Sequence, residues 1–286
     1  MKKSKIVTLL IILALIVVGG YSIYDGYNYA PSRLRVNYKS IEDEKINKSL
    51  NNLQIAFISD LHYLSYFNDE RLNQLVNTLN NANPDIVIFI GDLVDRSMNE
   101  EEYEKLLTSL KSINSKYGKF AVLGEADYAS EEINQQVESL LFDSEFEILK
   151  NKMIKLSKDT QDAIQLVGID SPSDNLANIE EAYKDIDENL YTITVVHTPD
   201  TSDDISANST DLIVAGDSHG GQIKIPLLGQ VYNKPLAEYY YSGIYNMDNK
   251  KLHVINGVGT TVDDVRINAP AEIVIYTLKN KASLVK

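Results

Sequence analysis

The stretch "DIVIFIGDLVD" (residues 85–95) joins an apolar run, suited to a buried strand, directly to a glycine and two aspartates. Two other stretches share this design, "LQIAFISDLH" (53–62) and "KFAVLGEAD" (119–127). Between the three, apolar residues recur at helical spacing over 72–79 and over 103–110, which predicts a helix after each of the first two strands. Strands that alternate with helices predict an α/β fold with a parallel sheet.

The second half of the chain is richer in strand than the first. Short apolar runs predict strands at 163–169, 190–196, 211–215, 222–225, 239–245, 251–256 and 272–278. One helix is expected near residues 176–186. The chain therefore combines a βαβαβ first half with a second half made mostly of strands.

Composition limits the chemistry that the protein can perform. The 286 residues carry a formal net charge of −14, so we expect no binding to nucleic acid, whose phosphates repel negative charge. The chain has no cysteine, which excludes disulfides and thiolate metal sites. Any metal ion must therefore be held by histidine, carboxylate, asparagine or backbone oxygen.

The N-terminus has the pattern of a single-pass membrane anchor. Three lysines within the first five residues precede an uncharged apolar run over residues 6–24, which is long enough to cross a bilayer. The positive-inside rule places the N-terminus in the cytoplasm and the rest of the chain outside it. The alternative is a signal peptide cleaved near Gly19–Gly20, which would release a secreted domain; we favour the retained anchor because no A-x-A cleavage site is present.

These patterns divide the chain into three parts. Residues 1–24 are expected to form the membrane anchor, residues 25–50 a polar linker and residues 51–286 the folded domain. Within the linker, "SRLRVNY" (32–38) is compatible with one edge strand.

Five of the predicted strands end in carboxylates or imidazoles. In chain order these residues are Asp60 and His62, Asp92 and Asp95, Glu125 and Asp127, His197, and Asp217 and His219. Each carboxylate alone would more often be a helix cap or a turn residue, but ligands of α/β sheets bind where strand ends meet. Their convergence predicts a divalent-metal site. The fourth histidine, His253, lies inside a predicted strand and is expected to be structural.

The order and spacing of these motifs resemble the calcineurin-like metallophosphoesterases, in particular the membrane-anchored or exported bacterial branch of that family. The family pattern is D-x-H, G-D-x-x-D, G-N-H-D/E, a lone histidine and G-H-x-H, and the resemblance covers residues 50–280. It implies a four-layer αββα sandwich, in which two mixed sheets are flanked by helices, preceded by the transmembrane helix. It also implies hydrolysis of a phosphodiester or phosphomonoester through a dinuclear metal centre.

The resemblance also assigns roles by position. It places Asp60, His62 and His219 on the first metal ion, Asp92 between the two ions, His197 on the second ion, and Asp95 with Arg96 behind the ligands. Loops at 62–70, 126–135 and 226–238 would set specificity. Arg266 would either contact a phosphate or form a surface ion pair.

Three positions depart from the family pattern. Glu125 stands where the family has an asparagine ligand, Asp217 replaces the first histidine of G-H-x-H, and Ala126 stands where a histidine assists the leaving group. Both carboxylates can still bind the second metal ion, so Glu125 and Asp217 complete the expected ligand set. Their added negative charge opposes an anionic phosphate. Loss of a positioned acid typically costs about 10²–10⁴ in rate, so we expect slower chemistry.

Oxygen-rich ligation favours Mn²⁺ for the two divalent ions, with Mg²⁺, Fe or Zn²⁺ as alternatives. Two functions remain open. The first is an attenuated or retuned metallophosphoesterase that acts outside the membrane on a phosphoester, such as a lipid or cell-envelope component. The second is a catalytically degenerate member of the same fold that binds metal or ligand without turnover. A domain without metal, in which the carboxylates are turn residues, is the third and plainest reading.

Overall fold

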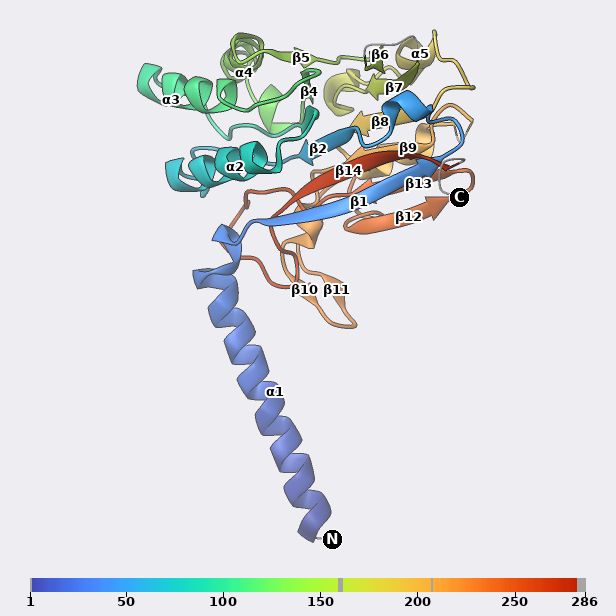
Figure 1. Cartoon of the computed structure of the whole chain (residues 1–286). Coiled ribbons are helices and arrows are strands. Elements are labelled where there is room, and N and C mark those ends of the chain that lie inside the picture. Colours follow the sequence, from blue (N-terminus) through green and yellow to red (C-terminus); the bar gives the residue numbers. More distant parts are fainter. Residues whose placement is uncertain (1, 159–161, 207, 282–286) are drawn as a thin grey trace.

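The computed structural model describes residues 2–158, 162–206 and 208–281 (Figure 1). The described chain forms two six-stranded sheets that pack face to face, with helices on their outer faces. A small two-stranded hairpin and one long N-terminal helix project from this body.

The first sheet has the strand order β1-β14-β2-β3-β4-β5. Its strands are β1 (Arg35–Asp43), β2 (Gln54–Ile58), β3 (Ile86–Ile90), β4 (Lys119–Val122), β5 (Phe146–Ile148) and β14 (Glu272–Asn280). All neighbours pair in parallel except β14 and β2, which are antiparallel. Every residue of β3 is buried, because this central strand is covered on both faces.

The second sheet has the order β12-β13-β9-β8-β7-β6. Its strands are β6 (Lys152–Ser157), β7 (Ala163–Gly168), β8 (Thr192–Val196), β9 (Leu212–Ala215), β12 (Gly243–Met247) and β13 (Lys250–Val254). The inner strands are parallel, while β6 and β12 join the two edges in antiparallel fashion. Both sheets are therefore mixed.

Helices cover the outer face of each sheet. The helices α2 (Asp69–Ala82), α3 (Glu100–Lys111) and α4 (Glu131–Asp143) lie on the first sheet, and α5 (Ile179–Tyr183) lies on the second. Short 3-10 turns occur at Ala30–Ser32, Lys48–Leu50, Ala126–Tyr128, Ser173–Asn175, Pro199–Asp204 and His219–Gly221. Asparagine or serine side chains cap the starts of α2, α3 and α4 by accepting a backbone N–H.

Successive side chains of a strand point to opposite faces of its sheet, so each strand contributes to two apolar layers. In β2, Ile55 and Phe57 face the second sheet, whereas Ala56 and Ile58 face the helices. The inner apolar layer between the sheets continues through Ile88 of β3 to Val195 of β8. This arrangement confirms the predicted four-layer αββα sandwich.

The N-terminal helix α1 (Lys2–Asn28) extends away from the domain (Figure 1). Its segment Ser4–Asn28 is long and apolar enough to cross a membrane by length and composition, and its most apolar stretch of 18 residues is not buried. The segment 25–50 is more structured than a free linker, because β1 pairs in parallel with β14 over Arg35–Asp43 and so becomes an edge strand of the domain.

Some elements differ from the sequence-based expectation. The structure adds α4, β5 and β6, which the sequence patterns did not indicate. The strand expected at 239–245 begins only at Gly243, because the amides of Tyr239 and Tyr240 donate to the carboxylate of Asp200 and not to a neighbouring strand. The strand expected at 222–225 is reduced to Lys224–Ile225.

Candidate metal centre

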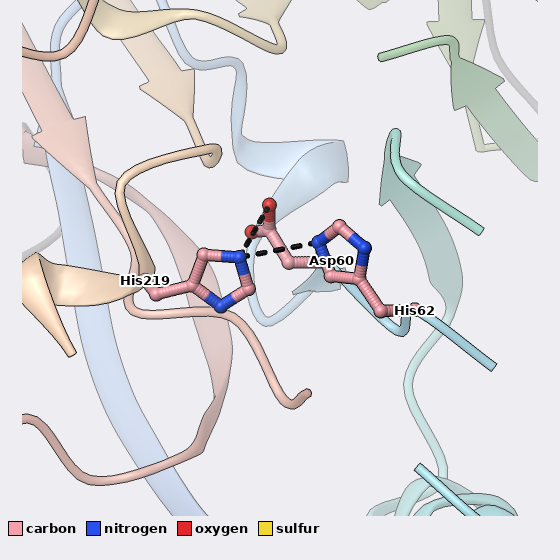
Figure 2. Close-up of side chains that lie close together, drawn as sticks. All are labelled: Asp60, His62 and His219. Carbon is pink, nitrogen blue, oxygen red and sulfur yellow. Dashed lines mark hydrogen bonds and ion pairs between the residues drawn. The ribbon is translucent and has the colours of Figure 1, made fainter. Parts of the chain in front are cut away.

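The polar strand ends of both sheets meet at one place. Asp60 and His62 follow β2, and His219 follows β9 on the facing sheet (Figure 2). The Nε2 atoms of His62 and His219 lie 3.1 Å apart, and His219 Nε2 lies 3.9 Å from Asp60 Oδ1. All three side chains are buried. We call these three residues the first cluster.

Four further residues form the second cluster: Asp92 after β3, Glu125 after β4, His197 after β8 and Asp217 after β9. One ligand atom from each lies within 4.8 Å of the others. His197 Nε2 is 3.2 Å from Asp92 Oδ2, 3.5 Å from Glu125 Oε2 and 3.7 Å from Asp217 Oδ1. Asp92 Oδ2 is also 3.4 Å from His62 Nε2, so Asp92 lies between the clusters.

The three imidazoles are oriented by contacts at their Nδ1 atoms. His62 Nδ1 lies 2.5 Å from Asp95 Oδ1, His197 Nδ1 lies 2.5 Å from the carbonyl of Ile90, and His219 Nδ1 lies 3.3 Å from the carbonyl of Gly259. A carbonyl or carboxylate acceptor at Nδ1 fixes the proton there and leaves Nε2 free for a metal ion. Each Nε2 faces its cluster.

The backbone of the site is strained. Asp60, His62, Asp92, Asp217 and His219 all have positive φ, between 47° and 63°. L-residues adopt this left-handed region rarely, and such conformations persist where the surrounding structure imposes them, often at functional sites. The strain turns the side chains that follow the strands back toward one point between the sheets.

The turn "GEAD" (124–127) supports the second cluster through its backbone as well as through Glu125. A Cβ at Gly124 would lie only 2.2 Å from Asp92 Oδ1, so the glycine makes room for that carboxylate. The N–H of Ala126 donates to Asp92 Oδ1 at 2.9 Å. The carboxylate of Asp127 accepts N–H groups from Asp92, Leu93 and Gly124, which ties the turn to the end of β3 as expected of a structural residue.

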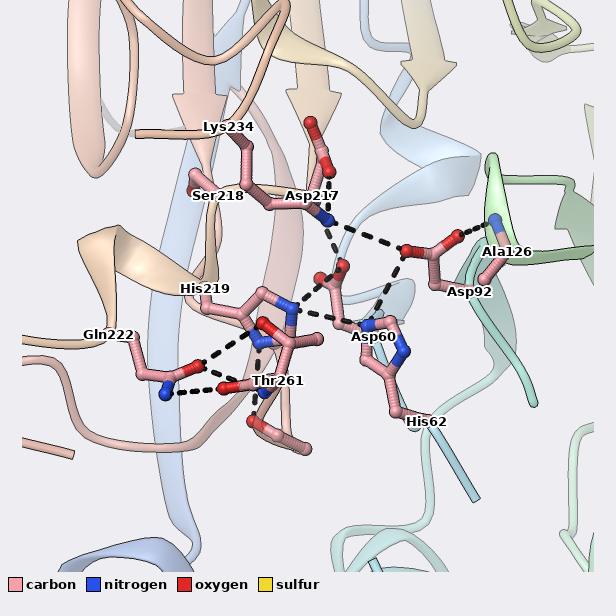
Figure 3. A network of polar contacts seen from close by, with 12 residues as sticks. Asp60, His62, Asp92, Ala126, Asp217, Ser218, His219, Gln222, Lys234 and Thr261 are labelled. Atoms are coloured by element: carbon pink, nitrogen blue, oxygen red, sulfur yellow. Dashed lines mark hydrogen bonds and ion pairs between the residues drawn. The ribbon is translucent and has the colours of Figure 1, made fainter. Parts of the chain in front are cut away.

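Lys234 is a site residue that the sequence patterns missed. Its ammonium group makes a close ion pair with Asp217 Oδ1 and lies 3.7 Å from Asp92 Oδ2 (Figure 3). It comes from the loop between the hairpin and β12, within the segment 226–238 that we expected to influence specificity. No motif surrounds it in the sequence, because its role depends on how that loop folds back over the strand ends.

The charges of the second cluster shift the pKa values of its members. Burial alone would lower the pKa of His197, but the carboxylates of Asp92, Glu125 and Asp60 outweigh it and raise that pKa well above the ordinary value. Burial would raise the pKa of Asp92, yet His197 and Lys234 hold it well below its usual range. The pKa of Lys234 is raised by the carboxylates despite its burial. Burial also raises the pKa of Glu125, although His197 opposes the shift, so the cluster favours the charged forms of Asp92 and His197 but not that of Glu125.

The first cluster behaves differently. Burial, together with His62 and Lys234, lowers the pKa of His219 well below the ordinary value. Burial raises the pKa of Asp60, although His197 opposes the shift. His219 therefore remains a neutral imidazole at neutral pH, the form in which it can bind a metal ion.

The buried donor atoms of both clusters fit divalent ions. Asp60 Oδ2 and Asp217 Oδ2 are buried and accept no hydrogen bond within the described part of the chain. A buried carboxylate oxygen without a partner is costly, and a cation removes that cost. The donor set is made of carboxylate oxygens and imidazole nitrogens, which suits Mn²⁺, Mg²⁺, Fe and Zn²⁺.

Four other residues from the sequence analysis lie outside the two clusters. Asp95 stands behind His62 as expected, but Arg96 pairs with Glu102 on the surface and does not reach the clusters. Arg266 neither contacts solvent nor forms a surface ion pair: it is buried and donates to backbone carbonyls, including those of Asn256 and Ala269. It therefore fixes the loop beside the first cluster. His253 is a buried residue of β13 that contacts Tyr276 Oη, as expected of a structural histidine.

Comparison with known proteins identifies related chains. The profile of the calcineurin-like phosphoesterase family matches residues 53–221. An uncharacterised metallophosphoesterase of Bacillus subtilis (strain 168) is 26% identical over 259 residues, which cover 89% of this chain and 90% of that protein. An uncharacterised metallophosphoesterase of Campylobacter jejuni is 30% identical over 280 residues, covering 96% of this chain and 71% of that protein. The UDP-2,3-diacylglucosamine pyrophosphatase of Chlamydia trachomatis is 26% identical over 299 residues, covering 85% and 88% of the two chains.

Proposed function

Because this chain belongs to the calcineurin-like phosphoesterase family, we propose that it is a metal-dependent hydrolase of a phosphodiester or phosphomonoester. The observation that carries the proposal is the meeting of two ligand clusters, seven residues in all, at the strand ends of both sheets. Divalent ions at such a centre supply Lewis-acid catalysis to phosphoester hydrolysis. The first cluster with Asp92 would hold one ion, and Asp92 with the rest of the second cluster would hold the other.

Charge balance supports a retuned centre. Two divalent ions contribute +4 and the carboxylates of Asp60, Asp92, Glu125 and Asp217 contribute −4, so the ions and carboxylates together are about neutral. Lys234 makes an ion pair with Asp217 and adds one positive charge at the same place. We therefore assign Lys234 the role of attracting and positioning the substrate phosphate, which the extra carboxylates would otherwise repel.

The chain holds its metal ligands in place but offers little help to the leaving group. The methyl group of Ala126 cannot donate a proton, and only its backbone N–H is used, to hold Asp92. Loss of an acid costs least when the leaving group is already stable as an anion. The proposal therefore favours phosphoesters or pyrophosphate-type bonds whose leaving group is itself a phosphate or a stabilised alkoxide, with Mn²⁺ as the preferred ion.

A lipid or cell-envelope substrate at the membrane surface fits the remaining observations. The chlamydial relative is by name a pyrophosphatase of UDP-2,3-diacylglucosamine, a lipid-linked nucleotide. A zebrafish relative is described as a transmembrane protein with a metallophosphoesterase domain. The helix α1 has the length and composition of a membrane span. We propose that α1 anchors the protein in the cell membrane with the N-terminus in the cytoplasm and the catalytic domain outside it.

The test uses the full chain purified in detergent. Hydrolysis of bis(p-nitrophenyl) phosphate is measured with Mn²⁺, and bound metal is determined by mass spectrometry. Asp92→Asn should lower kcat/KM by about 10³-fold or more, because this residue lies between the clusters. Asp143→Asn, an exposed carboxylate at the end of α4, is the matched control and should change little.

The same assay separates the second function. The absence of an imidazole at Ala126 and the ion pair between Lys234 and Asp217 are what a catalytically degenerate, ligand-binding protein would also show. That alternative predicts metal binding without hydrolysis by the native chain, and activity gained when Glu125→Asn, Ala126→His and Asp217→His are combined. A chain that binds no divalent ion would contradict both functions.

A further inference from the structure

The hairpin β10 (Lys224–Ile225) and β11 (Gly229–Gln230) carries an unusually exposed apolar turn. Leu227 at this turn is fully exposed and Leu228 is 80% exposed. Ile225 and Val231, on either side, are exposed as well. We call residues 225–231 the apolar tip. A turn in water normally carries glycine, asparagine or charged residues, so two exposed leucines there need an explanation.

The apolar tip stands out from the remaining surface. After α1, the described chain exposes twelve large apolar or aromatic side chains, and six of them fall within residues 225–239. Single exposed apolar residues are normal in soluble proteins, but a cluster of this kind marks a surface that meets an apolar partner.

The position of the apolar tip identifies that partner. The N–H of Arg266 donates to the carbonyl of Gly26 in α1 at 3.0 Å, which fixes the end of α1 to the segment 266–267. That same segment pairs with the hairpin, because Lys224 N donates to the carbonyl of Ile267 at 2.8 Å. The hairpin therefore emerges beside the end of α1. Figure 1 shows it projecting from the domain in the direction that α1 takes.

The end of α1 also carries aromatic residues suited to a membrane interface. Tyr21, Tyr24 and Tyr27 lie on its last turns and are exposed. Tyrosines gather at the level of the lipid headgroups in membrane-spanning helices. A hairpin fixed to this end of α1 therefore reaches the same interface.

We propose that the apolar tip inserts into the bilayer interface beside the anchor helix. This inference rests on the proposed membrane anchor. The tip would hold the domain against the lipid surface as a second attachment point, in addition to α1. The whole chain has a net charge of −14, so its surface has no general attraction for anionic lipids, and insertion of apolar side chains is the contact that can hold the domain against the lipid.

Insertion would also bring the metal centre to its substrate. The loop that follows β11 carries Lys234 into the second cluster. The residues that touch the membrane and the residue that reaches the phosphate are thus in one short segment. This arrangement is suited to a phosphoester held in a lipid headgroup, and not to a free soluble phosphoester.

The absence of tryptophan from the chain provides a clean probe. Leu228→Trp places a single tryptophan at the apolar tip, and Phe142→Trp places one at an exposed position of α4. Val17→Trp places one inside α1. Each full-length variant is reconstituted into neutral phosphatidylcholine vesicles with and without brominated acyl chains, and the quenching of fluorescence is measured.

We expect brominated lipid to quench Leu228→Trp by at least about half, with a blue-shifted emission, and to leave Phe142→Trp unquenched. Equal, low quenching of these two variants would overturn the proposal. A blue shift of Leu228→Trp without quenching would also overturn it, because the tip would then be covered by protein, such as a second copy of the chain. Since no turnover is measured, loss of the proposed catalytic function does not affect this result. Failure of Val17→Trp to be quenched would instead show that α1 is not in the bilayer, and the proposal would fall with the anchor.

Discussion

The two halves of the candidate metal centre lie side by side in the fold but are chemically unlike, and only the second has a partly exposed member, Glu125. The first cluster has two imidazoles and one carboxylate, Asp60, and no lysine of the described residues makes an ion pair with it. The second cluster has one imidazole and three carboxylates, and Lys234 is paired with it. The first cluster has the composition of an ordinary metal ligand set, whereas the second cluster is already paired with a positive side chain of the protein, Lys234.

This difference bears on how tightly each cluster would bind a metal ion. Placing three carboxylates, of which Asp92 and Asp217 are buried, beside one imidazole without a cation would be costly. Lys234 offsets part of that charge in the folded chain before any metal binds. No cation among the described residues pairs with Asp60 Oδ2 in the first cluster, so this oxygen depends on a metal ion for a partner. We therefore expect the two clusters to bind metal with unequal affinity, the first more tightly.

The largest expected effect comes from removing one ligand from each half. His219→Ala should weaken the tighter Mn²⁺ site by about 10²–10³-fold, because a metal site loses a large share of its binding energy with each ligand. Asp217→Ala should leave the tighter site unchanged and affect only the weaker one. Calorimetric titration of the full chain in detergent measures both affinities. If both variants weakened both Mn²⁺ sites to the same extent, the two clusters would not differ in metal affinity.

The second prediction concerns the residue behind the first cluster. Asp95→Asn removes the charge that orients His62 while keeping a similar shape. Partners of ligating histidines typically contribute 10–100-fold to metal affinity, so the tighter site should weaken by about that factor. The weaker site should not change. Glu102→Gln, which breaks the surface pair with Arg96, is the matched control. If only the weaker site lost metal affinity, the first cluster would be the weaker site and the second cluster the tighter one.

The third prediction concerns Lys234. Its ammonium pairs with Asp217, so it would compete for this carboxylate with a metal ion bound at the second cluster. Lys234→Met should tighten the weaker Mn²⁺ site by about 10-fold, a change of about 1.4 kcal/mol. Lys234→Arg keeps the charge and should keep the weak site. The same Lys234→Met variant should raise the KM for an aryl phosphodiester, because the substrate loses a cation. A weaker second site in Lys234→Met would show that the lysine assists metal binding.

The first cluster could be predicted from the sequence because its residues come directly after predicted strands. Asp60 and His62 end an apolar strand, and a strand end in an α/β sheet is already a binding position. The same reasoning located Asp92, Glu125, His197, Asp217 and His219 as candidates, and the structure brings all of them together. Whether they bind metal remains a prediction.

Lys234 and the buried Arg266 could not be predicted, because their environments are made by long-range loop packing. Lys234 lies in a loop without strand or helix period, and its partner Asp217 follows another element. Arg266 was expected either to contact a phosphate or to form a surface ion pair, yet it is buried and the carbonyls of one loop surround it. The edge strand β1 illustrates the same limit: its partner β14 is more than two hundred residues away in the chain.

The smallest expected effect is on the pH dependence of stability. It comes from His253 and tests why the pKa of His197 differs from that of His253. Both imidazoles are buried, but the pKa of His253 is lowered to about 3 by burial and by Lys39, with no carboxylate to oppose the shift. In the unfolded chain a histidine titrates near its ordinary pKa of about 6.5. Between these two values the unfolded state binds the proton and the folded state does not, so stability falls as the pH is lowered from about 6.5 toward 3.

His253→Gln removes this proton uptake and keeps an acceptor for the hydroxyl of Tyr276. Between pH 7 and pH 5.5, the native chain should therefore lose about 1 kcal/mol more stability than the variant, since each unit of pKa difference corresponds to about 1.4 kcal/mol. Urea denaturation in a chelating buffer measures this, because the metal-free clusters then contribute equally to both proteins. Identical losses in the two proteins would mean that His253 accepts a proton in the folded state. In that case the carboxylates around His197, which raise its pKa, would not be the only reason why the pKa values of His197 and His253 differ.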